Sequence, residues 1–219
     1  MAKKIDVWNI FQQSLIITLK NWKIVYTLAS PIVFSLMLSL FSIVFLLMGI
    51  SEAGVTSLLT YWWVTLILLT VIVFSTWLSM VSVGAIILAV EKIHKKQKIN
   101  QTILIWKQAF KNSRRMVVAF SLEQLFLTFG LLLFIIPGLF LAVRLSLVVP
   151  GCILEKKGYG IKRSWNATKG NFWKIFLVLF IWNSAFIILG GLPYLSIVNI
   201  LLLPIYLTTL ALLYMQLKK

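Results

Sequence analysis

Long apolar stretches alternate with short basic segments along this chain. A helix needs about 20 apolar residues to cross a bilayer, and four stretches meet that requirement directly. A further apolar region, 116–154, is too long for one helix and contains Pro137-Gly138. Proline lacks a backbone donor and disfavours helix in the residue before it, so we expect a tight turn there. The pattern predicts an all-α integral membrane protein with six transmembrane helices, at residues 24–50, 61–90, 116–136, 139–154, 172–191 and 195–217.

A second pattern precedes each predicted pair of spans: an amphipathic segment followed by a basic, polar turn. These segments are residues 6–19, 99–111 and 160–169. The second is the clearest, because Ile99, Ile103, Trp106 and Phe110 recur at helical spacing. A helix with one apolar, Trp-containing face and one cationic face is typical of the membrane interface. We therefore expect three hairpins, each preceded by a cytoplasmic amphipathic helix, in a single transmembrane domain over residues 1–219.

The charge distribution adds an orientation to this plan. The chain has 21 Lys and Arg but 5 Asp and Glu, and only 12% of its residues are charged, about half the share in soluble domains. Twenty of the 21 cations lie in residues 1–23, 91–115, 155–174 and 218–219, and the alternate connections carry none. Short loops rich in Lys and Arg stay in the cytoplasm. This predicts a multi-pass plasma-membrane protein with both termini cytoplasmic.

The basic residues beside the predicted membrane entries are candidates for a lipid head-group platform. They are Lys20, Lys23, Lys107, Lys111, Arg114, Arg115, Lys162, Arg163, Lys169 and Lys174. The candidate interfacial anchors are Trp8, Trp22, Trp106, Trp165 and Trp173. Each basic residue near an anionic leaflet contributes about 1 kcal/mol of attraction. The alternative is that these cations only enforce topology. We expect anionic lipids as partners, leave open a protein partner or a homo-oligomer, and expect no nucleic acid, because the cations are tied to membrane-entry helices.

Two charged residues, Glu123 and Arg144, fall inside predicted spans. An intramembrane charge costs about 2.5–3.5 kcal/mol on insertion scales, which makes such residues candidates for function. Counted from the basic ends of their spans, they lie roughly 12 and 16 Å deep, at comparable depth. An ion pair between them is one reading. If depth is instead counted along both spans from the turn at Pro137, Glu123 lies closer to the cytoplasm than Arg144. The difference is then larger than an Arg side chain comfortably reaches. A structural role, an anion or head-group contact, and proton coupling through Glu123 all remain open.

The residues that common catalytic and metal sites require are scarce. His94 is the only histidine and Cys152 the only cysteine, so neither a zinc site nor a Ser-His-Asp set can be assembled. We expect no metal, no cofactor and no enzymatic activity. For an intramembrane enzyme, the only candidate catalytic residues would be Glu123 with Ser121 or Thr128.

A distinctive stretch runs from Ile136 to Phe176. It contains Ile136-Pro137-Gly138-Leu139, Arg144-Leu145-Ser146-Leu147, Val149-Pro150, Leu154-Glu155, Gly158, Lys162-Arg163-Ser164-Trp165 and Thr168 to Lys174. It resembles the YciC-like group of small polytopic membrane proteins and the related membrane domain of some glycerophosphodiester phosphodiesterases. The resemblance implies architecture more than activity, and the chain has no catalytic barrel that would carry the diesterase reaction. The motif positions it gives, with structural roles by default, are Pro137, Gly138, Arg144, Pro150, Glu155, Ser164, Trp165, Gly170, Asn171 and Trp173.

These observations give two functional hypotheses. The first is a non-enzymatic multi-pass membrane protein that engages anionic lipids, in envelope homeostasis or in transport of a lipidic or small anionic substrate. The second is a membrane scaffold or an accessory subunit of a larger complex.

Overall fold

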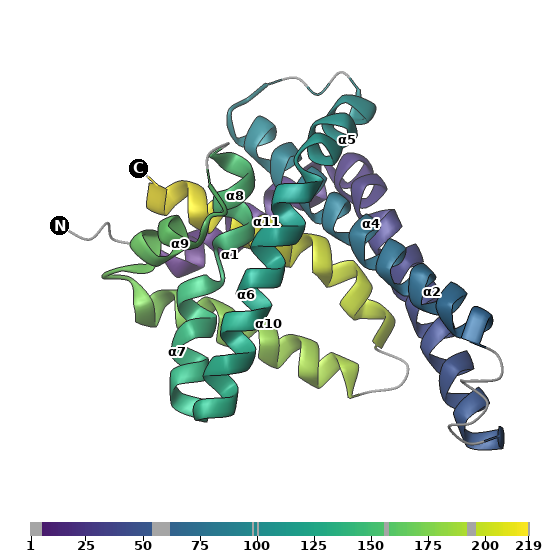
Figure 1. Ribbon diagram of the computed structural model, residues 1–219. Coiled ribbons are helices and arrows are strands. Elements are labelled where there is room, and N and C mark those ends of the chain that lie inside the picture. The colour runs from purple at the N-terminus through teal and green to yellow at the C-terminus, as the bar shows by residue number, and fades with distance from the viewer. Residues whose placement is uncertain are drawn as a thin grey trace.

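The computed structural model describes residues 6–53, 62–97, 99, 101–155, 158–191 and 196–218. In these ranges the chain is helical and has no strand (Figure 1). The helices are α1 (Val7–Lys20), α2 (Trp22–Ala53), α4 (Trp62–His94), α5 (Thr102–Lys111), α6 (Ser113–Leu133), α7 (Ile135–Leu145), α8 (Val148–Leu154), α9 (Ile161–Thr168), α10 (Phe172–Gly190) and α11 (Ser196–Lys218). Six helical segments are long and apolar enough to span a membrane: α2, α4, α6, α7 with α8, α10, and α11. The predicted all-α, six-span class is confirmed.

The first hairpin consists of α2 and α4, which pack along each other (Figure 1). A ladder of serines joins them: the hydroxyls of Ser35 and Ser79 lie 2.8 Å apart, and those of Ser39 and Ser75 lie 2.6 Å apart. Small side chains let membrane helices approach closely, and hydroxyls add hydrogen bonds between them. The predicted connection between these spans, at 51–60, lies mostly outside the described residues.

The second hairpin, α6 with α7, turns three residues earlier than the sequence predicts. Phe134 is extended (φ −168°, ψ 155°), and α7 begins at Ile135. Pro137 therefore lies in the first turn of α7, where helices tolerate proline because its missing N–H has no intrahelical partner. Gly138 is buried, and a Cβ there would lie 2.6 Å from Leu131 Cδ2. The prediction of a turn at Pro137-Gly138 is wrong; the pair serves helix initiation and close packing of α7 on α6.

The fourth span is broken, whereas the sequence predicted one helix over 139–154. α7 ends at Leu145 and α8 begins at Val148. A hydroxyl from α9 satisfies backbone groups at the break: Ser164 Oγ donates to the Arg144 carbonyl at 2.6 Å and accepts from the Leu147 N–H at 3.2 Å. Irregular backbone inside a membrane persists only where protein or water supplies such partners. The break is thus fixed by α9.

The helices converge at one end of the molecule and separate toward the other (Figure 1). The main core lies at the converging end, where α4 is buried almost continuously from Val81 to Val90 and α11 from Leu207 to Tyr214. Toward the other end the α2–α4 hairpin diverges from the rest, and large apolar side chains such as Phe41 and Val73 are exposed. The described ends of the chain, α1 and the last turn of α11, both lie at the converging end.

Three short helices, α1, α5 and α9, occur close to the ranges predicted for the interfacial segments, and each immediately precedes a span. Each also packs against the spans. The rings of Phe11 and Trp182 are 5.8 Å apart, and the Thr18 hydroxyl donates to Thr208 at 3.2 Å, so α1 is held against α10 and α11. Only the outward side of each short helix remains free for lipid. Their predicted place in the membrane interface stays a prediction.

Candidate functional site

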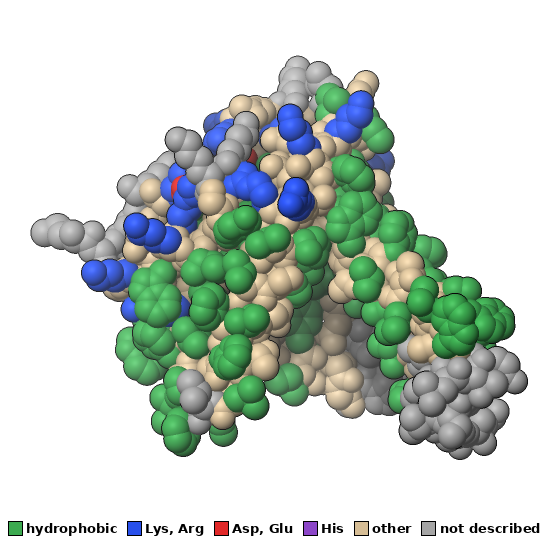
Figure 2. Space-filling model, viewed as in Figure 1, with side chains coloured by type: hydrophobic (Ala, Val, Ile, Leu, Met, Phe, Trp, Pro, Cys, Tyr) green, Lys and Arg blue, Asp and Glu red, His purple; other side chains and the backbone are tan. Residues whose placement is uncertain are grey.

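Lysine and arginine side chains gather at the converging end, above a region rich in hydrophobic side chains (Figure 2). Seven of the ten predicted platform cations are exposed there: Lys20, Lys23, Lys107, Lys111, Arg114, Lys162 and Lys169. They come from three separate parts of the sequence and share one end of the fold. The structure therefore assembles a cationic surface from the basic turns.

Arg115, Arg163 and Lys174 are half-buried. The Arg115 guanidinium donates to the Gly158 carbonyl at 2.7 Å. Arg163 donates from Nη1 to the Glu155 carbonyl at 2.8 Å, and its Nε lies 2.5 Å from Glu155 Oε2. The two arginines thus hold the connection between α8 and α9. Their inclusion in a free head-group platform needs correction, because both have protein partners.

The five predicted tryptophan anchors divide in the same way. Trp8, Trp22 and Trp173 are exposed, at 71%, 56% and 75%, as an interfacial anchor must be. Trp106 is half-buried and packs against the main core. Trp165 is 39% exposed and also belongs to a cluster with Phe140 and Arg144. Trp8, Trp22 and Trp173 can therefore meet lipid, and Trp106 holds α5 on the protein. Trp165 holds α9 while part of its surface stays exposed.

Arg144 does not pair with Glu123. Its guanidinium carbon lies 5.1 Å from the Phe140 ring centre and 5.2 Å from that of Trp165, where a cation is attracted to the ring faces. Nη1 also donates to Thr168 Oγ1 at 3.3 Å. Of the readings left open for Arg144, the ion pair with Glu123 does not form, because Arg144 precedes the break in the fourth span and meets α9 instead. These contacts give Arg144 a structural role, the connection of α7 to α9.

Glu155 organises a cluster that the sequence did not reveal. Besides Arg163, its carboxylate accepts from the Tyr214 hydroxyl at 2.5 Å and lies 3.6 Å from Lys218 Nζ. Tyr214 and Lys218 belong to α11, and Tyr214 lies 59 positions along the chain from Glu155. The sequence resemblance implies only a structural role by default for Glu155, since no local pattern indicates so distant a partner. The cluster ties α8, α9 and the end of α11 together.

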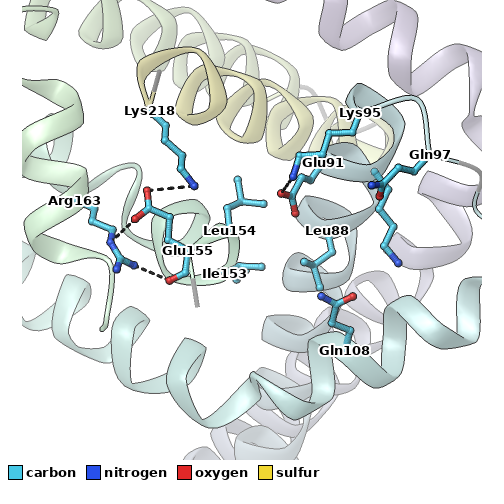
Figure 3. Close-up of a pocket in the computed structure, with 11 residues that line it drawn as sticks. Leu88, Glu91, Lys95, Gln97, Gln108, Ile153, Leu154, Glu155, Arg163 and Lys218 are labelled. Carbon is cyan, nitrogen blue, oxygen red and sulfur yellow. Dashed lines mark hydrogen bonds and ion pairs between the residues drawn. The ribbon is translucent and has the colours of Figure 1, made fainter. Parts of the chain in front are cut away.

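A cavity of about 600 Å³ lies beside this cluster at the converging end. Four cations and two acids line it together with Gln97, Gln108 and three apolar side chains; the charged residues are Lys92, Lys95, Arg163, Lys218, Glu91 and Glu155. In Figure 3 the Glu155 cluster and the Glu91–Lys95 pair lie on opposite sides of the cavity. The Lys95 ammonium is 2.6 Å from the Glu91 carboxylate. The excess of cations favours an anionic occupant.

Glu123 lies elsewhere, in a second cavity of about 340 Å³ between the spans, which is partly open to the surface. Residues of α4, α6, α7, α8, α10 and α11 contribute to its lining, and Asn183 and Tyr206 are among the polar ones. No hydrogen bond or ion pair joins the Glu123 carboxylate to another residue in the described part of the chain. The sequence indicated Glu123 as an unusual residue, but the residues that surround it could be identified only from the structure.

No protein-family model, curated protein or solved structure matches this chain. The candidate sites therefore stand on their geometry alone. Arg144 contacts Ser164 and Trp165 of α9, and Glu155 contacts Arg163 of the same helix.

Proposed function

We propose that this multi-pass membrane protein binds the head groups of anionic lipids at the cytoplasmic face of the plasma membrane, without catalysing a reaction on them. The observation that carries the proposal is the gathering of exposed cations from separate chain segments at one end of the fold, next to hydrophobic, lipid-compatible surface (Figure 2). Attraction to anionic lipid and burial of apolar surface act together in this arrangement.

The 600 Å³ cavity is the place where one head group binds most specifically in this proposal. Lys92 from α4 and Lys218 from α11 approach it from different helices and supply ammonium groups for a phosphate. Glu155 holds Arg163 at 2.5 Å, so Arg163 positions the wall of the cavity. Lys218 lies 3.6 Å from Glu155 and Lys95 lies 2.6 Å from Glu91, so these two lysines would meet a phosphate in competition with the acids. The site would serve envelope homeostasis by retaining anionic lipid, or the passage of a lipidic or small anionic substrate.

The test measures lipid retention by the purified protein in a neutral detergent. Native mass spectrometry compares added phosphatidylglycerol with added phosphatidylcholine. We expect preferential retention of phosphatidylglycerol, and a loss of about 100-fold in its affinity in the Lys92→Gln/Lys95→Gln/Lys218→Gln variant, since each lysine contributes about 1 kcal/mol. The matched Lys→Arg triple variant keeps the charge and should keep the preference.

Two results would overturn the proposal: equal retention of both lipids by the wild type, or unchanged retention of phosphatidylglycerol by the triple Gln variant. The wild type should also lose phosphatidylglycerol in moderate salt, because exposed charge interactions are screened by salt.

A further inference from the structure

The cavity around Glu123 has the composition of a ligand site. Its volume, about 340 Å³, falls within the range of about 300–1,000 Å³ that small-molecule sites occupy. Its lining is mostly apolar, with five polar side chains: Glu123, Gln124, Ser146, Asn183 and Tyr206. Such a lining, with a few convergent polar groups, is typical of binding sites.

The hydrogen-bonding groups of this cavity include free acceptors, beside the possible donors Gln124 and Tyr206. Asn183 donates from Nδ2 to the Leu179 carbonyl of its own helix at 2.8 Å, and Ser146 donates to the Val143 carbonyl at 2.9 Å. The Asn183 amide oxygen makes no hydrogen bond within the described residues, and the same holds for the Glu123 carboxylate. A carboxylate and amide oxygens together are complementary to a ligand that donates hydrogen bonds and carries positive charge.

A second hollow lies beside this cavity, between α4 and α6. It has a volume of about 560 Å³ and shares two lining residues, Met80 and Phe120, with the Glu123 cavity. Val73 and Phe74, on its α4 side, are 68% and 56% exposed. The view in Figure 2 shows the surface recessed between the α2–α4 hairpin and the rest of the molecule. Where these helices cross the bilayer, the hollow faces lipid.

The lining of this second hollow is suited to hydrocarbon. It consists largely of aliphatic and aromatic side chains, and the hydroxyls of Thr70 and Thr76 both donate to carbonyls of their own helix, to Leu66 at 2.7 Å and to Ile72, respectively. These hydrogen bonds within α4 leave few polar groups of the hollow without a partner. An alkyl chain in the hollow would replace lipid contacts with protein contacts of the same character.

We propose that the Glu123 cavity and the hollow between α4 and α6 form one site for an amphiphile with a primary ammonium head group and a single alkyl chain. The ammonium lies against Glu123 and the amide oxygen of Asn183, and the chain passes Met80 and Phe120 into the hollow. An ammonium has three donors and no acceptor, which matches the free acceptors of the cavity. Pairing also removes the cost of an unaccompanied carboxylate among the spans.

This site is separate from the cationic end, and its ligand has the opposite charge from the anionic lipids proposed there. The two proposals can therefore fail independently. Arg144, the other intramembrane charge, does not line the cavity and is engaged with α9, so no cation among the described residues of the lining competes for Glu123.

The test uses the full chain in nanodiscs of phosphatidylcholine and the probe dodecylamine with a photoreactive diazirine on its alkyl chain. After illumination, peptide mass spectrometry maps the labelled residues. We expect labelling of α4 and α6 around Phe74, Trp77 and Val117, with competition by unlabelled dodecylamine at least tenfold stronger than by dodecanol or dodecanoate. Dodecanol and dodecanoate carry the same chain without the ammonium.

Two variants separate the parts of the site. Glu123→Gln keeps the size of the side chain and removes its charge, and it should weaken dodecylamine binding at least tenfold. Met80→Trp fills the junction of the two spaces without altering charge, and it should displace the label from the hollow; it also provides the measurement if Glu123→Gln fails to fold. Equal competition by dodecanol, labelling spread over all lipid-facing helices, or wild-type affinity in a folded Glu123→Gln protein would each overturn the proposal.

Discussion

Gly160 is the residue whose identity the backbone constrains most strongly. Its φ is +82°, in the left-handed region, and a Cβ there would lie 2.2 Å from the Val148 carbonyl oxygen and 2.8 Å from the Cys152 nitrogen. Glycine satisfies both conditions because it lacks a Cβ. The close approach sets the position of α9 on α8, and hence of the Ser164 and Arg144 contacts.

We predict that Gly160→Ala lowers the free energy of unfolding by more than about 2 kcal/mol, because it adds a backbone clash to a left-handed conformation that costs about 1–2 kcal/mol by itself. Gly158→Ala is the matched control: its φ is +66°, but a Cβ there meets nothing within 4 Å. It should cost about 1 kcal/mol. Reversible unfolding in detergent, followed by circular dichroism, measures both. Equal losses would show that the clash with α8 does not exist.

Arg144 allows a second prediction at the scale of one residue. Lys keeps the charge but lacks the planar guanidinium that lies near two rings and reaches Thr168. Arg144→Lys should therefore loosen α9, with amide hydrogen exchange across Ile161–Thr168 faster by about tenfold, the equivalent of about 1.4 kcal/mol. The exposed Arg114→Lys change is the control and should leave this exchange unaltered. Unchanged exchange in Arg144→Lys would contradict the clamp.

The sequence indicated which residues are unusual, but not what they contact. Glu123 and Arg144 stand out because each is a charge within an apolar stretch. Pairing between them was one open reading. It depended on counting depth along an unbroken fourth helix, and the break after Leu145 invalidates that count. The partners of Glu155 on α11 follow from tertiary packing across the chain, which no local spacing encodes.

At the scale of elements, the α2–α4 ladder links helix packing to sequence. Ser35 and Ser39 on α2 face Ser79 and Ser75 on α4 in antiparallel register. Each hydroxyl also bonds within its own helix, as Ser39 does to the Ser35 carbonyl at 2.8 Å. The hydrogen bonds between the two helices therefore contribute only modestly to stability. The small size of serine also contributes, because it lets the helices pack closely.

We predict that Ser39→Ala costs about 0.6 kcal/mol of stability, the average for an interhelical hydrogen bond in membranes. Ser39→Leu should cost about 1–3 kcal/mol, because the added volume forces the helices apart. Ser30→Leu on the same helix is the control, since Ser30 is exposed, and it should have almost no effect. Unfolding of the protein in mixed micelles by SDS ranks the three variants. A Ser39→Leu protein as stable as Ser30→Leu would contradict the packing.

Helices could be predicted where local composition alone determines them. Hydropathy and length identify the six spans, and basic turns identify the three short helices. The turn of the second hairpin was not predictable in this way, because Pro137-Gly138 suits a turn and also suits the first turn of a helix packed closely on its neighbour. Only the contact with Leu131 distinguishes the two, and it is a tertiary contact.

In the molecule as a whole, the basic residues and the densest part of the core lie at the same end. The cations lie at the end where the helices converge and the core is dense (Figures 1 and 2). An even number of spans places both termini on the same side of a membrane, and both described ends lie at this end. Because basic loops are retained in the cytoplasm, the converging end should be cytoplasmic and the diverging tips should face outward.

Cysteine labelling in spheroplasts tests this orientation. In a Cys152→Ser background, which removes the only cysteine, Lys111→Cys reports the cationic end and Gly191→Cys reports the exposed C-cap of α10. A membrane-impermeant maleimide should label Gly191→Cys in closed spheroplasts, but Lys111→Cys only after permeabilisation, at least a tenfold difference between the two. The Cys152→Ser protein alone should remain unlabelled. The reverse labelling pattern would place the cations outside the cell, against the positive-inside rule. The cationic cavity could then not bind lipid of the cytoplasmic leaflet.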